Sequence, residues 1–99
     1  MRLFWSADAV ADRTGILDWY SAENPAVALA TDAALSRHAK RLRRFPQLGR
    51  PGRVEGTREA PLPRTPFILV YRVADDTMTI LRVLHGARQW PSPPPTSTS

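Results

Sequence analysis

Residues 65–86, TPFILVYRVADDTMTILRVLHG, decide the fold of this chain. β-branched and aromatic residues concentrate in 67–74 and again in 78–84, so both runs predict β-strands. Asp75-Asp76 between them is typical of a tight turn. A connection this short joins antiparallel strands, and the stretch therefore predicts a β-hairpin near the C-terminus.

The register of this hairpin decides which side chains share a face. A two-residue turn sets Val70 opposite Leu81 and places Arg72 and Arg82 on opposite faces. A three-residue turn at 75–77 sets Val70 opposite Arg82, and Arg72 and Arg82 then share a face. A one-residue slip exchanges the faces, so the sequence leaves both registers open. We favour the three-residue turn because it collects positive charge on one side.

Upstream of the hairpin, residues 53–60 predict a further strand, joined to it by a turn at 61–64. The three strands form a predicted antiparallel meander. The preceding segment, Pro46 to Pro51, is expected to be a loop.

The N-terminal half predicts a short strand and two helices. Leu3-Phe4-Trp5 is the strand, and Ser6 can cap a helix over 7–23. The core face of that helix is expected to hold Val10, Ile16, Leu17 and Tyr20. Asn24-Pro25 is typical of a helix start and predicts a second helix over 25–44, which ends before Phe45-Pro46. Its core face is expected to hold Ala28, Leu35, Ala39 and Leu42.

These elements predict one α+β domain over residues 1–91, in which an N-terminal strand and a helical hairpin pack on a small antiparallel β-sheet. Residues 92–99 are rich in Pro, Ser and Thr and are expected to form a disordered tail. No apolar stretch approaches the ~20 residues that a membrane-spanning helix needs, and no signal peptide is evident.

The composition favours an acidic partner. The net charge is +5, and the basic residues are 13 Arg and a single Lys. Arginine matches phosphate and carboxylate groups well, although a GC-rich genome would produce the same excess. The chain has no cysteine and only two histidines, His38 and His85, which excludes disulfides, a cysteine nucleophile and a His-based metal cluster. We expect no metal or cofactor and a cytoplasmic location.

Several arginines lie in the loop and strand region, where they could converge on a phosphate or carboxylate site or be scattered surface charge: Arg50, Arg53, Arg58, Arg82 and Arg88. His85, at the end of the last strand, could be a general acid or base or a strand-end residue bonded to backbone. Tyr71 and Trp90 could stack on bases or close the end of the core. Glu55 and Glu59 could do acid–base work, but pairing with arginine is favoured.

The order of these motifs resembles the RelE/ParE toxins of bacterial type II toxin–antitoxin systems. The matching pieces are Asn24-Pro25, Gly49-Arg50, Gly56-Thr57-Arg58-Glu59, the strand over 67–73 and Ile80-Leu81-Arg82-Val83-Leu84-His85-Gly86-Ala87-Arg88. The resemblance covers residues 1–91 and implies the fold predicted above. It also implies one of two activities: ParE-like toxins inhibit DNA gyrase, whereas RelE-like toxins cut mRNA on the ribosome without a metal.

Two departures favour a ParE-like toxin, which is not an enzyme. RelE-like nucleases typically carry Arg where this chain has Ile68, and a Tyr near the chain end where it has Trp90. The residues expected to bind the target are Arg50, Arg53, Arg58, Arg82, His85, Arg88 and Trp90. If the protein is instead an endoribonuclease, the candidates for catalysis are Arg58, Arg82, His85 and Arg88.

The resemblance further implies a cognate antitoxin, a toxin–antitoxin hetero-oligomer and roles in growth inhibition and plasmid stabilisation. We expect the antitoxin to fold on the toxin and cover its helical hairpin and sheet. An exposed apolar stripe on the second helix, with Leu35 and Leu42 beside Arg41, is the expected antitoxin-binding site.

Overall fold

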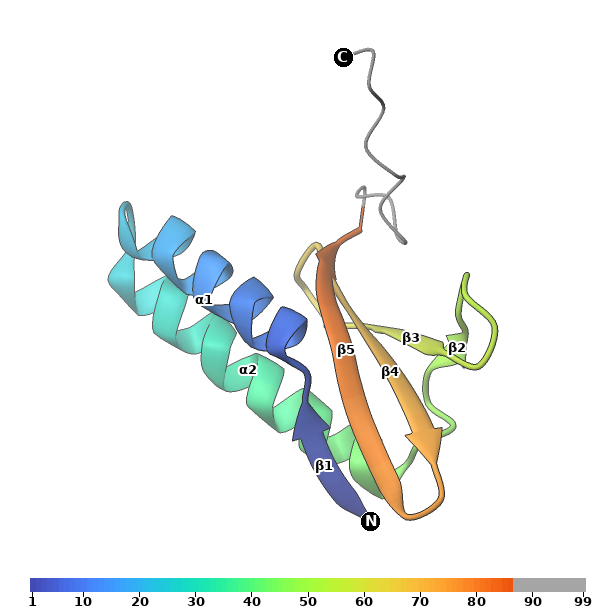
Figure 1. Cartoon of the computed structure of the whole chain (residues 1–99). Coiled ribbons are helices and arrows are strands. Elements are labelled where there is room, and N and C mark those ends of the chain that lie inside the picture. Colours follow the sequence, from blue (N-terminus) through green and yellow to red (C-terminus); the bar gives the residue numbers. More distant parts are fainter. Residues whose placement is uncertain (87–99) are drawn as a thin grey trace.

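The computed structural model describes residues 1–86, which form two helices and five strands (Figure 1). In chain order the elements are β1 (Arg2–Trp5), α1 (Ala7–Ser21), α2 (Pro25–Arg44), β2 (Arg50–Pro51), β3 (Arg58–Pro61), β4 (Phe67–Ala74) and β5 (Thr77–His85). The predicted α+β class is confirmed. Arg88, Trp90 and the expected tail lie outside the described residues. Within residues 1–86, no helix is long and apolar enough to cross a membrane.

The five strands form one mixed sheet in the order β1-β5-β4-β3-β2. The predicted meander is confirmed, since β3, β4 and β5 pair antiparallel. β1 pairs parallel to the first half of β5, from Arg2 opposite Thr77 to Trp5 opposite Ile80. Figure 1 shows β1 and β5 side by side, with the two antiparallel helices together beside the sheet. Because β1 ends at Trp5, no strand within residues 1–86 pairs with the second half of β5 on that side.

The core lies between the helical hairpin and one face of the sheet. Leu35, Ala39 and Leu42 of α2 are fully buried in a cluster that includes Leu69 and Ile80 of the sheet. The predicted core face of α2 is therefore confirmed, and burial of each leucine stabilises the fold by roughly 1.5–3 kcal/mol. The expectation that Leu35 and Leu42 form an exposed stripe is wrong, because both have 0% exposure and no partner can contact them in this fold.

The predicted core face of α1 is partly wrong. Ile16 and Tyr20 do pack against the core, but Val10 is 51% exposed and Ala9 is buried in its place. The reason is Asp12, which turns toward β5 and accepts a hydrogen bond from its backbone. Ala9, Asp12 and Ile16 lie on one face at helical spacing, and this rotation leaves Val10 outside.

Two strand boundaries also differ from the prediction. β3 begins at Arg58 instead of residue 53, because residues 53–57 form a turn in which the Thr57 hydroxyl donates to the Val54 carbonyl at 2.6 Å. Gly56 in this turn has φ of +82°, a conformation that favours glycine. Arg50–Pro51, expected in a loop, forms the two-residue strand β2 against β3.

Each register predicted for the last hairpin is right over part of its length. The turn has two residues, since Ala74 pairs with Thr77. A β-bulge between Val70 and Tyr71 then shifts the pairing, so Val70 lies opposite Arg82 as the three-residue turn had predicted. Arg72 is two residues from Val70 on β4, so Arg72 and Arg82 share a face as favoured, but Arg82 is bound to Asp12 of α1.

Candidate target-binding surface

A buried carboxylate organises the arginines near β2 and β3. Glu59 is only 2% exposed, and its carboxylate accepts from the Arg53 backbone N–H at 2.8 Å and from the Arg53 Nε at 3.2 Å. Arg50, the cross-strand neighbour of Glu59, approaches the same carboxylate at 3.9 Å. The preference for Glu–Arg pairing is thus confirmed for Glu59. Glu55 is exposed in the preceding turn.

Arg58 comes from the same end of the sheet, but it precedes Glu59 on β3, so its side chain leaves the opposite face of the strand. Its Nη1 donates to the Gly49 carbonyl at 2.7 Å, and Arg58 lies opposite Tyr71 in the sheet. We call Arg50, Arg53 and Arg58 the arginine cluster. Two of these arginines meet the buried Glu59 carboxylate, and the Arg50 side chain remains 66% exposed. Exposed guanidinium groups of this kind can bind phosphate or carboxylate.

Tyr71 has a structural role. It is fully buried, its hydroxyl donates to the Pro46 carbonyl at 2.7 Å, and it accepts from the Gly49 N–H at 2.9 Å. Burial raises the pKa of this hydroxyl, although the Gly49 N–H and the Arg58 charge act in the opposite direction. Gly49 is required, since a Cβ there would lie 2.3 Å from the Tyr71 hydroxyl oxygen. Of the alternatives for Tyr71, the structure supports closure of the core.

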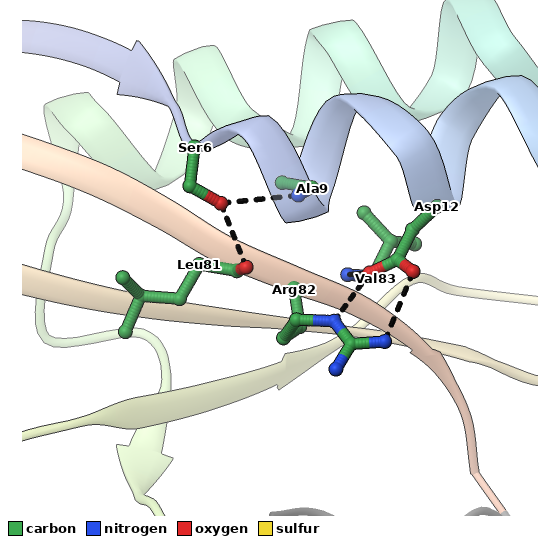
Figure 2. A network of polar contacts seen from close by, with 6 residues as sticks. All are labelled: Ser6, Ala9, Asp12, Leu81, Arg82 and Val83. Carbon is green, nitrogen blue, oxygen red and sulfur yellow. Dashed lines mark hydrogen bonds and ion pairs between the residues drawn. The ribbon is translucent and has the colours of Figure 1, made fainter.

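Arg82 stabilises the edge of β5 (Figure 2). Its Nε donates to the Asp12 Oδ2 at 2.8 Å and its Nη2 donates to Oδ1 at 3.1 Å. The same Oδ2 accepts from the Val83 backbone N–H at 2.9 Å. This hydrogen bonding to Asp12 raises the pKa of Arg82 further above its usual range. The bidentate pair fixes the guanidinium against α1, away from the arginine cluster.

Ser6 completes the same edge. Its hydroxyl donates to the Leu81 carbonyl at 2.9 Å and accepts from the Ala9 N–H at 3.0 Å, which confirms Ser6 as the cap of α1 (Figure 2). Ser6 and Asp12 therefore satisfy backbone groups of β5 that β1 is too short to reach. Asp12 was missed in the sequence. Its only signal is a carboxylate within an otherwise apolar helical stripe.

His85 lies far from the arginine cluster along the sheet. It is exposed and pairs with Phe67, whereas Arg58 pairs with Tyr71, four positions further along β4. Its ring meets the Phe67 ring edge-to-face at 6.1 Å between centroids. It also lines a groove beside α1 together with Trp19. Of the predicted target-binding residues, the structure thus brings Arg50 and Arg53 together on Glu59, places Arg58 on the adjacent position of β3, and separates Arg82 and His85 from them. Arg88 and Trp90 lie outside the described residues.

Arg41, the remaining predicted antitoxin contact, is exposed on α2. It lies at a groove between α2 and the turn that joins β3 to β4, with Arg37 and Arg64. At the same groove His38 has a buried Nε2 without a hydrogen-bond partner. Burial, and then the Arg41 charge, lower the pKa of His38, while a hydrogen bond to the Pro61 backbone opposes them.

A helical hairpin on a small sheet whose surface carries organised arginines defines the class of protein, the RelE/ParE toxin superfamily. The family model described as ParE toxin of the type II toxin–antitoxin system, parDE, matches residues 3–90. The chain belongs to this ParE toxin family.

Relatives and solved structures agree with this assignment. Y4kP, a candidate toxin of Sinorhizobium fredii, is 33% identical over 90 residues, 91% of this chain and 93% of the relative. A chain from the chromosomal ParDE TA system of P. aeruginosa superposes with a TM-score of 0.77 at 34% identity, covering 84% of this chain and 92% of the other. A chain of the toxin–antitoxin complex RelBE2 from Mycobacterium tuberculosis gives 0.62 at 29% identity, covering 85% and 95%.

Proposed function

We propose that this toxin acts in the cytoplasm by inhibiting DNA gyrase, and that a cognate antitoxin neutralises it in a hetero-oligomer. The observation that carries the proposal is the match to the ParE family model over residues 3–90. The arginine cluster supplies a surface for the target, since guanidinium groups bind both phosphates and carboxylates. Arg88 and Trp90 remain proposed target-binding residues on the family resemblance alone.

The state of Glu59 and Tyr71, two of the candidate acid–base groups, supports a toxin that is not an enzyme. Metal-independent RNA cleavage needs a group that takes a proton from the nucleophile and a cation beside the phosphate. Glu59 is buried between two arginines, and the Tyr71 hydroxyl is committed to Pro46 and Gly49. Arg82 is bound to Asp12. At the departure named above, Ile68 is a buried apolar side chain.

The second candidate function is ribosome-dependent cleavage of mRNA. It is favoured by similarity to Toxin RelE2 of Caulobacter vibrioides, which is 30% identical over 87 residues, 88% of this chain and 97% of that relative. The candidates for catalysis would be Arg58, Arg82, His85 and Arg88. For this chemistry Arg82 would have to leave Asp12, because both of its bonds to that carboxylate occupy the guanidinium.

The two functions are separated by offering both targets to the same preparation of folded toxin, freed from its antitoxin. Gyrase, ATP and supercoiled plasmid are incubated with the toxin, and protease treatment then releases any cleaved DNA. A parallel reaction contains programmed ribosomes, whose mRNA is mapped for new 5′ ends. Linear plasmid with intact mRNA supports gyrase inhibition. Cut mRNA with supercoiled plasmid unchanged would replace the proposal by the endoribonuclease.

A further inference from the structure

The groove between α2 and the β3–β4 turn is a second basic surface, separate from the arginine cluster. Arg37, His38 and Arg41 line it from α2, and Leu62 and Arg64 line it from the turn. Leu48 also lines the groove, which has a volume of about 660 Å³. This volume suits a few side chains of a bound segment.

The positive charge of the α2 groove has no neutralising partner within residues 1–86. Arg37 and Arg41 are one helical turn apart, so both side chains lie on one face of α2. Arg64 stands across the groove, in a turn where its φ is +63°. No acidic residue lines the groove, and the ion pairs among the described residues involve none of these three arginines. A ligand with carboxylates or phosphates would therefore gain three unshared cations.

The rest of the lining favours a peptide over nucleic acid. Leu48 is 51% exposed at the rim, and Leu62 lies buried in the wall. Single-stranded nucleic acid stacks mainly on large aromatic side chains, and within residues 1–86 no Phe, Tyr or Trp lines this groove. A segment that alternates acidic and aliphatic side chains would cover Leu48 and meet the arginines together, which a sugar–phosphate backbone cannot do.

We propose that the α2 groove binds an acidic, partly aliphatic segment of the antitoxin, with carboxylates on Arg37, Arg41 and Arg64 and an aliphatic side chain on Leu48. This inference rests on the toxin–antitoxin pairing. It replaces the site expected at Leu35 and Leu42, which are buried, and retains Arg41 as a contact. The His38 ring, which also lines the groove, would add a fourth cation to the three arginines when it is protonated.

The test measures the affinity of full-length toxin for the antitoxin encoded beside it, by calorimetry at low and moderate salt. The groove variant is Arg41→Glu with Arg64→Glu. The control variant is Arg43→Glu with Arg72→Glu, which changes the net charge by the same amount. Arg43 lies in the last turn of α2 and Arg72 in the sheet, and neither residue lines the groove. We expect the groove variant to bind at least about tenfold more weakly and the control within about threefold of wild type. Thermal melts must show both variants folded.

Equal weakening of the two variants would mean that only net charge matters and would overturn the proposal, as would unchanged affinity of the groove variant. A groove variant that keeps the antitoxin but loses a labelled 20-base-pair DNA would assign the groove to nucleic acid instead. If wild-type toxin did not bind the protein encoded beside it, the toxin–antitoxin pairing on which this proposal rests would be refuted. Gyrase is absent from this measurement, so failure of gyrase inhibition and failure of the groove proposal are distinguishable.

Discussion

Asp12→Ala should destabilise the fold more than any other change of an α1 surface residue. The substitution deletes three hydrogen bonds to β5, two from the Arg82 guanidinium and one from the Val83 N–H. The Asp12 and Arg82 side chains are 12% and 22% exposed, so both are mostly desolvated. Removing one partner of a buried pair costs about 3–5 kcal/mol. Because Arg82 keeps some contact with water, we expect about 2–3 kcal/mol here.

For a domain of this size, each kcal/mol lowers Tm by roughly 4–8 °C, so Asp12→Ala should lower it by about 8–24 °C. Circular dichroism at 222 nm measures the melt. Asp18→Asn is the matched control, since Asp18 is an exposed carboxylate on the same helix, and it should change stability by less than about 0.5 kcal/mol.

A double-mutant cycle with Arg82→Met separates the pair from the backbone contact. The coupling between Asp12 and Arg82 should account for about half of the loss, and the remainder should persist in the Arg82→Met background because the Val83 N–H still loses its acceptor. If Asp12→Ala melted within 2 °C of wild type, the assignment of Asp12 as the residue that completes the β5 edge would be refuted.

Three further substitutions test the packing around the two basic surfaces. Gly49→Ala should lower stability by about 1–3 kcal/mol in urea unfolding, because the new Cβ meets the rigid Tyr71 ring, and a variant as stable as wild type would contradict that close approach. The folded-state pKa of His38 is lowered, chiefly by burial, so the folded protein should lose stability as the pH falls from 6.5 to the folded-state pKa. His38→Gln should therefore reduce the difference in Tm between about pH 7.5 and 5.5. If the substitution left that difference unchanged, His38 would be excluded as its cause. Glu59→Gln should cost about 1–3 kcal/mol, since Arg53 loses its charged partner, whereas Glu55→Gln, in the exposed turn, should be nearly neutral in the same unfolding assay.

The sequence alone predicted an element correctly where its start and stop residues agree with the periodicity of its apolar residues. α2 begins and ends where Asn24-Pro25 and Phe45-Pro46 predict, because proline fixes the first turn and prevents continuation past the last. β4 and β5 follow from continuous runs of β-forming residues. The arginines of the cluster were among the predicted target-binding residues, and pairing of Glu59 with arginine was also favoured.

The remainder depends on tertiary contacts that no local pattern contains. Asp12 joins α1 to a strand 70 residues away, so its carboxylate resembles any exposed helical acid in the sequence. β3 starts late because the Thr57 hydroxyl and N–H both bond Val54 and compete with strand pairing. The bulge beside Val70 adds one residue to β5. The alternation of residue types along the sequence does not reveal such an extra residue.

Burial explains the error at the expected antitoxin site. An amphipathic stripe such as Leu35 and Leu42 is the same in sequence whether the protein's own sheet or a partner covers it. In the structure the sheet covers it. Arg41 lies outside that stripe and stays accessible, which is why it alone of the three can serve the proposed groove.

The yield of linear plasmid in the gyrase reaction tests the central claim most directly. The reaction compares wild-type toxin with a variant of the arginine cluster, Arg50→Ala with Arg58→Ala, and with the control Arg43→Ala with Arg44→Ala on α2. We predict linear DNA with wild type and the control, and at least about tenfold less with the cluster variant at equal concentration of folded protein. Absence of linear DNA with wild-type toxin that is folded and still arrests growth would contradict gyrase inhibition. Equal yields from all three proteins would instead contradict the role of the arginine cluster.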